Sequence, residues 1–169
     1  MKSAHSGGKK ITMRKFAEVL SLLALTVLAW TTWHALAGPE PLPDHIPTHF
    51  DFAGQPNGWG SWHSLLFLPA VALALYILLA VVSRFPSMFN YPVRVTPENR
   101  SRLEDLALGM LTWMKAEVLC LFAWIQWAIL ASARSGRGEL PFVLLPVALV
   151  VTAGTTGWYI AAMRRTGRR

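Results

Sequence analysis

Apolar residues gather in four long runs, separated by short segments that hold most of the charged residues. A helix needs about 20 residues to cross the roughly 30 Å hydrocarbon core of a bilayer, and each run is close to that length. The runs lack the period-two alternation of barrel strands, and a helix satisfies its own backbone hydrogen bonds in lipid. The pattern predicts an all-α integral membrane four-helix bundle, a single polytopic domain over residues 1–169 with helices at about 16–36, 65–82, 97–131 and 140–163.

The composition agrees with a bilayer as the solvent. Hydrophobic residues make up 53% of the 169 positions and charged residues 15%, and the mean hydropathy is +0.37. The net charge of +7 does not indicate nucleic-acid binding, because the cations lie in clusters between the apolar runs and form no single basic face. The single cysteine, Cys120, excludes an intramolecular disulfide.

The distribution of Lys and Arg predicts the orientation in the membrane. Cations fill the N-terminal tail, residues 83–106 and the C-terminal tail, whereas residues 37–64 have none. Cytoplasmic segments of membrane proteins are enriched in Lys and Arg. We therefore expect a multi-pass protein of the plasma membrane, with both termini and residues 83–106 in the cytoplasm and the loop 37–64 outside.

The first run also permits an alternative interpretation as a cleaved signal peptide. The basic start, the apolar stretch 20–29 and the small-residue pattern at Ala35 and Ala37 fit such a peptide. Against this, the run is long, and Trp30 and Trp33 suit a membrane interface better than a cleavage region. Cleavage would leave three helices.

The loop 37–64 is rich in residues that restrict or define backbone shape. Five prolines fix φ, Gly54, Gly58 and Gly60 permit positive φ, and Asn57-Gly58 is a strong turn signal. Loops of defined shape on rigid scaffolds often carry binding functions. The pattern therefore favours a structured Pro/Gly-rich external loop that recognises or senses something.

Two sequence stretches in this region carry a family resemblance. Leu42-Pro-Asp-His-Ile-Pro-Thr-His-Phe-Asp51, followed by Gly54-Gln-Pro-Asn-Gly-Trp-Gly-Ser61, resembles the signature of domain-of-unknown-function family 1648, a membrane domain of SdpI-type immunity proteins. Asn90-Tyr-Pro92 and Thr96-Pro-Glu-Asn-Arg100 resemble the family's stretch before its third helix, so the resemblance covers roughly residues 16–130. The matching loop positions are Leu42, Pro43, Asp44, Ile46, Pro47, His49, Phe50, Gly54, Pro56 and Gly58. Trp62 departs from the pattern, since members often have Lys there, and the immunity proteins have further helices.

The resemblance implies an immunity or signalling role. In the relatives, the implied function is protection from a secreted peptide toxin and sequestration of a transcriptional repressor at the membrane. The expected partners are the lipid bilayer, an extracellular peptide or toxin and a cytoplasmic regulator, without nucleic acid. The predicted recognition residues are Pro43, Asp44, Pro47, His49, Phe50, Gly54, Pro56 and Trp59.

Histidine and aspartate side chains in or beside the loop offer an alternative, a metal site. His45, His49, Asp51 and His63 are ligand types that suit zinc, which could activate a water. Their spacing matches no zinc signature, however. The competing interpretation is that His49 and Asp51 hydrogen-bond the loop backbone and cap the turn near Gly54. We expect no cofactor, with zinc as the alternative.

The third run contains two ionisable residues, Lys115 and Glu117, and the amide Gln126. Glu117 is predicted to lie in the hydrocarbon zone, where ionisable residues are costly and often functional. Helical spacing places it on one face with Trp113, Cys120, Trp124 and Trp127, which we expect to point inward. Lys115 is expected to extend to the cytoplasmic headgroups, and Gln126 to hydrogen-bond another helix.

Two further local patterns concern helix ends and packing. Thr96-Pro97 predicts the start of the third helix, which would be about 52 Å long with its first turns in the cytoplasm. Ala153 and Gly157 place small residues four apart in the fourth helix. That spacing permits close packing, either within the chain or in a homodimer.

Motifs of enzymatic chemistry are missing, including a nucleophile elbow, a phosphate loop and a His-Glu-x-x-His helix. We therefore expect a non-enzymatic membrane protein with a recognition loop. The alternatives are a metal-dependent membrane enzyme using the loop histidines and a small transporter using Glu117.

Overall fold

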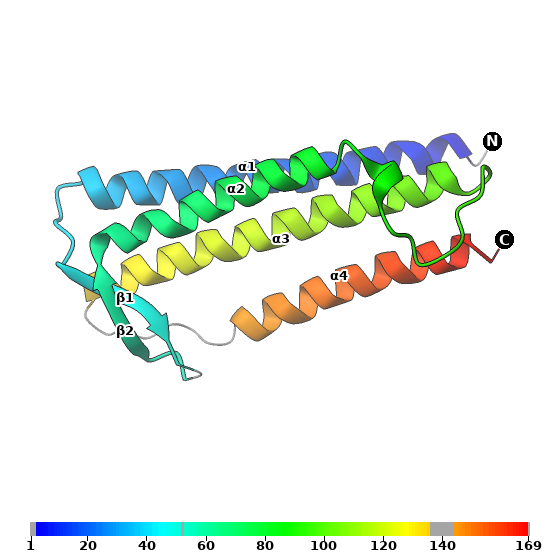
Figure 1. Cartoon of the computed structure of the whole chain (residues 1–169). Coiled ribbons are helices and arrows are strands. Elements are labelled where there is room, and N and C mark those ends of the chain that lie inside the picture. Colours follow the sequence, from blue (N-terminus) through cyan, green and yellow to red (C-terminus); the bar gives the residue numbers. More distant parts are fainter. Residues whose placement is uncertain (1–2, 52, 136–143, 169) are drawn as a thin grey trace.

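The chain forms an elongated helical bundle with a small hairpin at one end (Figure 1). The computed structural model describes residues 3–51, 53–135 and 144–168, with side chains from Thr12 to Arg134 and from Leu144 onward within these ranges. The long helices are α1 (Ser3–Ala37), α2 (Phe67–Val82), α3 (Arg100–Ser135) and α4 (Leu144–Thr166). There are two strands, β1 (His45–Phe50) and β2 (Pro56–Ser61). There are also two short 3₁₀ helices, η1 (Trp62–Leu66) and η2 (Pro86–Met88).

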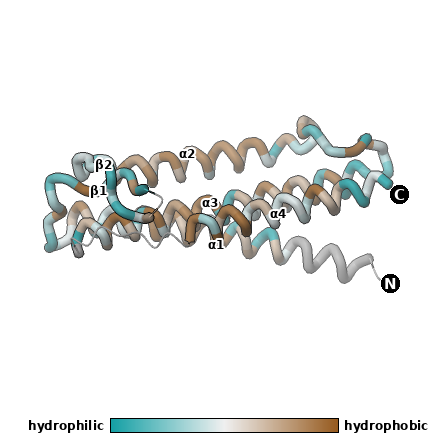
Figure 2. Tube along the Cα trace, turned by 90° about the horizontal axis from the view of Figure 1, so that it is seen from below, coloured by the Kyte–Doolittle hydropathy of each residue, from teal (hydrophilic) through white to brown (hydrophobic). Residues whose placement is uncertain are grey.

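Four helices in the described residues are long and apolar enough to cross a membrane. Apolar residues dominate their middle portions, and hydrophilic residues gather at the ends (Figure 2). The predicted all-α membrane fold is therefore confirmed, and the protein is a multi-pass membrane protein. Both termini lie at one end of the bundle and the hairpin lies at the other (Figure 1).

Several helix boundaries differ from the sequence-based expectation. Helix α1 begins at Ser3 instead of near residue 16, because its charged first turns continue the helix beyond the apolar run. Helix α2 begins at Phe67, since residues 62–66 form η1. Helix α4 extends to Thr166, while its predicted start near residue 140 lies outside the described residues.

The start of α3 shows how the predicted cap operates. The regular helix begins at Arg100, and its amide donates to the Thr96 carbonyl at 3.0 Å. The Asn99 side chain accepts from the Thr96 amide at 2.8 Å, as in a capping box. A hydrogen bond with the Thr96 side chain lowers the pKa of the exposed Glu98 carboxyl. Thr96 thus caps the helix as predicted, although residues 97–99 form a turn before it.

Helices α1 and α3 run parallel and form the core of the bundle. The buried positions of α1 recur at spacings of three and four, and include Ala17, Ser21, Ala24, Leu28 and Ala35. The facing stripe of α3 has the same spacing, with Ala116, Leu119, Ala123, Gln126 and Leu130. Mostly small residues at these positions allow two helix backbones to approach closely in a membrane.

This stripe corrects the predicted inward face of α3. Cys120 is exposed, and the side chain of Trp127 is 54% exposed. The buried stripe runs beside the tryptophan face, because α1 packs on the small and aliphatic positions of α3. Trp113 and Trp124 are half-buried at its border, and Trp127 lies outside the packed core. Glu117 instead points toward α4.

Helix α4 packs on α3 through one side only. The most apolar stretch of α4 has no buried residue, whereas Met163 and Thr166 near its end are buried. A Cβ atom added at Gly154 or Gly157 would meet nothing within 4 Å. The small residues of α4 were predicted to pack either within the chain or in a homodimer. Packing within the chain is not supported at these two glycines.

Candidate functional site

The loop between α1 and α2 forms an antiparallel hairpin whose turn is built by Asp51. The Asp51 carboxylate accepts from the amides of Ala53 at 2.8 Å and Gln55 at 2.9 Å. Gly54 adopts a positive φ of 78°, which favours glycine. The interpretation that His49 and Asp51 cap the turn near Gly54 is thus confirmed for Asp51. The His49 side chain instead hydrogen-bonds the side chain of Asn57.

The predicted turn at Asn57-Gly58 is wrong, because these residues lie within β2. Gly58 is needed there for close strand packing. A Cβ atom at Gly58 would approach the His49 Cβ to 2.9 Å, and one at Gly60 would meet the Ser64 Oγ and Thr48 Cγ2 at 2.9 Å. The glycines of the motif therefore make room for side chains of β1 and η1.

One side of the hairpin is anchored in the protein. Ile46 is 1% exposed and packs with Ala35 of α1, Leu65 of η1 and Leu130 of α3. The neighbouring Pro47 is also fully buried. The hairpin is therefore fixed to three elements of the bundle and does not hang from a flexible linker.

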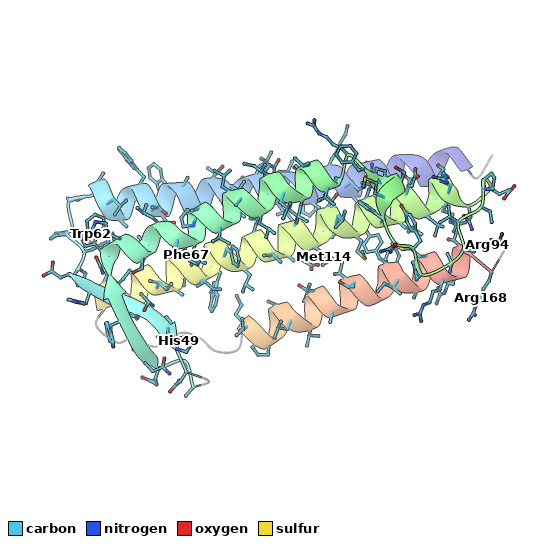
Figure 3. All side chains as sticks on the ribbon, viewed as in Figure 1. His49, Trp62, Phe67, Arg94, Met114 and Arg168 are labelled. Carbon is cyan, nitrogen blue, oxygen red and sulfur yellow. The ribbon has the colours of Figure 1, made fainter. Side chains whose placement is uncertain are left out.

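The hairpin also carries exposed side chains. Trp59 is 59% exposed, and His45, Thr48, Asn57 and Ser61 are also exposed. The His49 Nδ1 hydrogen-bonds the Asn57 side chain across the strands. Figure 3 shows His49 on the hairpin. An anchored hairpin thus presents an aromatic ring with polar neighbours.

The remaining predicted recognition residues fall into three groups by burial. Pro43 and Asp44 are exposed in the irregular segment before β1, whereas Phe50 and Pro56 are half-buried and pair across the ends of the strands. Pro47 and Gly54 are buried, so they shape the hairpin and cannot make extensive contact with a ligand.

The structure does not bring the predicted zinc ligands together. Among the described residues, no group of three or more His, Cys, Asp or Glu side chains could hold a metal ion. Asp51 caps the turn, His49 binds Asn57, and the His63 Nδ1 lies 2.8 Å from the Ser61 Oγ while its ring stacks on Trp62. The strand register separates these side chains, because His45 and His49 pair with different positions of β2.

An ion pair between the buried Lys115 and the half-buried Glu18 was not predicted from the sequence. The Lys115 Nζ lies 2.7 Å from the Glu18 Oε2, and the Tyr76 hydroxyl donates to the Glu18 Oε1 at 2.7 Å. Lys115 is 5% exposed and its Nζ also lies 4.4 Å from the centroid of the Tyr76 ring. The expectation that Lys115 extends to the headgroups is therefore wrong, because Glu18 and Tyr76 satisfy its charge within the protein.

The sequence does contain a signal for this pair. Glu18 lies inside the first candidate span, at a depth where an ionisable side chain needs a partner. Lys115 lies inside the third span, and opposite charges in two spans are natural candidates for pairing. The pair joins α1, α2 and α3.

Gln126 forms a second polar link between helices, as predicted. Its side chain is fully buried, and its Nε2 donates to the Thr32 Oγ1 at 3.0 Å and to the Leu65 carbonyl at 3.1 Å. This connects α3 with α1 and with η1, directly beneath the hairpin. The Oε1 of Gln126 has no hydrogen-bond partner in the described part of the chain.

Glu117 forms a third interhelical contact, between α3 and α4. The Thr155 hydroxyl donates to the Glu117 Oε1 at 2.7 Å, while the buried Oε2 has no partner in the described part of the chain. A cavity of about 210 Å³ adjoins the carboxylate and is lined mainly by apolar side chains of both helices, including Leu121, Val147 and Val151.

This geometry defines a helical membrane protein with a hairpin anchored at one end of the helical bundle. Residues 20–73 match the family model of the Domain of unknown function (DUF1648), which confirms the resemblance for the segment from α1 to the first part of α2. The chain is also 28% identical over 148 residues to an uncharacterised protein of Archaeoglobus fulgidus, a match that covers 79% of this chain and 78% of the relative. No solved structure matches significantly.

Proposed function

We propose that this protein is a non-enzymatic recognition or sensing protein of the plasma membrane, with its hairpin outside the cell and both termini in the cytoplasm. The observation that carries the proposal is the exposed Trp59 on a hairpin whose opposite side is packed into the bundle. Exposed tryptophans on rigid supports are typical anchors of binding surfaces. The family motif, which covers the same hairpin, adds support.

The charges around the hairpin favour a basic partner. Residues 37–64 contain Glu40, Asp44 and Asp51 and no Lys or Arg. Glu40 is partly offset by Arg134 of α3, at 3.7 Å, while Asp44 is exposed. We therefore take the ligand to be an extracellular peptide with positive charges, which would include a peptide toxin.

Loss of Trp59 tests the recognition role. Phage-displayed lysine-containing peptides are selected on the wild-type protein in nanodiscs, and their binding is then measured with Trp59→Ala. We expect affinity to fall about thirtyfold, as for an aromatic hot spot. Trp33→Ala is the matched control, because Trp33 is a 68% exposed tryptophan of α1 outside the hairpin. Equal binding to Trp59→Ala and to the wild type would refute the proposal.

The orientation can be measured with single cysteines in a Cys120→Ser background. Gln55→Cys in the hairpin turn should react with a membrane-impermeant maleimide on intact cells. Arg168→Cys at the C-terminal end should react only after the cells are permeabilised. Both positions are exposed, so labelling depends on the side of the membrane. The reverse labelling pattern would place the hairpin in the cytoplasm.

A second candidate function is ion or proton movement through Glu117. It is favoured by the Glu117 Oε2, which lies beside the cavity between α3 and α4 and has no hydrogen-bond partner among the described residues. In proteoliposomes, this function predicts a proton flux that Glu117→Gln abolishes and that Glu98→Gln, an exposed carboxyl outside the spans, leaves intact. Absence of flux in the wild type would exclude it.

Two expected partners correspond to other surfaces. A cytoplasmic regulator would meet the segment 83–106 at the termini end, and a second copy would meet the open glycine side of α4 at Gly154 and Gly157.

A further inference from the structure

A cavity of about 450 Å³ lies at the termini end of the bundle, opposite the hairpin. Four parts of the chain enclose it: the last residue of α2, the segment between α2 and α3, and facing sides of α3 and of α4. Its lining consists of Val82, Phe89, Asn90, Tyr91, Pro92, Ala107, Met110, Leu111, Ile160, Met163 and Arg164. The volume falls within the range of small-molecule and cofactor sites. The motif Asn90-Tyr-Pro92, which the hairpin function leaves unexplained, forms one wall.

This wall is held in place by the protein. The Tyr91 hydroxyl donates to the Pro86 carbonyl at 2.7 Å, and Phe89 and Tyr91 pack against the buried cluster of Leu103, Leu106, Ala107 and Met163. At the end of α4, a Cβ atom on Gly167 would approach the Val93 Cβ to 2.6 Å, so the segment lies closely against that helix. The cavity is therefore part of the folded structure.

The chemistry of the lining is amphipathic. Most of the lining side chains are apolar, and the polar ones include Asn90 and the cationic Arg164. Within the described ranges, Arg164 takes part in none of the ion pairs. Arg94 and Arg168 lie at the same end of the molecule, as their labels in Figure 3 show, and make this region strongly positive. The site thus combines a hydrocarbon-compatible wall with an unpaired guanidinium.

The position of the cavity matches a lipid interface. The apolar middle of the helices gives way to hydrophilic residues at this end (Figure 2), and Arg164 lies in the last turn of the candidate span Leu144–Thr166. A phospholipid in a bilayer has the same sequence of apolar and polar groups, with its acyl chains in the hydrocarbon core and its phosphate at the boundary. Guanidinium groups bind phosphate in a bidentate manner.

We propose that this cavity is a binding site for an anionic phospholipid. The phosphate binds Arg164 and Asn90, and an acyl chain lies against Met110, Leu111 and Ile160. The proposal is independent of hairpin recognition, because the two sites occupy opposite ends of the bundle and share no residue. It also gives the Asn90-Tyr-Pro92 motif a role, as the wall that closes the site.

Native mass spectrometry of the detergent-solubilised protein tests this site. Phosphatidylglycerol and phosphatidylcholine with identical acyl chains are added in parallel, and the retained lipid is counted. We expect phosphatidylglycerol to be retained preferentially and Arg164→Gln to lower its retention about fivefold, as for loss of one cationic contact. Arg165→Gln is the matched control, because it has the same net charge as Arg164→Gln but Arg165 does not line the cavity. This variant should retain the lipid as the wild type does.

Two further arms separate a lipid from a simple anion. Leu111→Trp, which fills part of the cavity, should reduce phosphatidylglycerol retention while its Tm shows that it is folded. Glycerol 3-phosphate, which has the anion without the chains, should not compete. Competition by glycerol 3-phosphate, an equal effect of the two arginine substitutions, or equal retention of the two lipids would each overturn the proposal.

Discussion

Replacing Lys115 by Ala is expected to destabilise the protein by about 3 kcal/mol, because it leaves Glu18 without a cation inside the bundle. Both carboxylate oxygens of Glu18 are engaged, one by Lys115 and the other by Tyr76. The side chain of Glu18 is 37% exposed in the structure, which places the expected cost at the low end for a broken buried pair. Unfolding in mixed micelles, followed by tryptophan fluorescence, measures the change.

The double variant Glu18→Gln/Lys115→Met is the control for this prediction. It removes both charges while keeping side-chain volume, and an amide oxygen can still accept from the Tyr76 hydroxyl. Replacing a whole buried pair in this way is often nearly neutral, so we expect the double variant to regain most of the lost stability. A cost below about 1 kcal/mol for Lys115→Ala would show that Glu18 is solvated without its partner.

Truncation of Gln126 to Ala should have the second large effect, a loss of about 3 kcal/mol in the free energy of unfolding. The side chain is fully buried, so its removal creates a cavity among α1, α3 and η1. It also removes the donor of the Leu65 carbonyl, which lies at the base of the hairpin. The hairpin should therefore loosen together with the bundle, and hydrogen exchange of the β1 and β2 amides should increase.

The matched substitution Gln126→Leu separates packing from hydrogen bonding. Leucine nearly fills the space but donates no hydrogen bond, and single interhelical hydrogen bonds in membranes contribute only about 0.6 kcal/mol on average. Thr32 keeps its bond to the Leu28 carbonyl at 2.7 Å. We expect Gln126→Leu to cost about 1 kcal/mol, and a loss as large as that of Gln126→Ala would instead assign the effect to the hydrogen bonds.

The sequence predicts a loop of defined shape, but it does not predict the geometry of the hairpin. Prolines and glycines indicated a shaped loop, and Asp51 was recognised as a candidate cap. The turn was nevertheless placed at Asn57-Gly58, because that pair favours turns when only local preference is considered. Cross-strand packing decided otherwise, since the His49 Cβ leaves no room for a side chain at Gly58.

By itself, the sequence determined the membrane class, the number of spans, the cap at Thr96 and the family resemblance. Each of these depends on local composition or on residues close in the chain, to which hydropathy and capping chemistry apply directly. Only the tertiary structure decided which face of α3 is buried, that Lys115 pairs with Glu18, and that Asn90-Tyr-Pro92 encloses a cavity with α4. These features join residues that are far apart in the chain. They depend on how apolar helices pack against one another, and hydropathy cannot distinguish a helix face that meets protein from one that meets lipid.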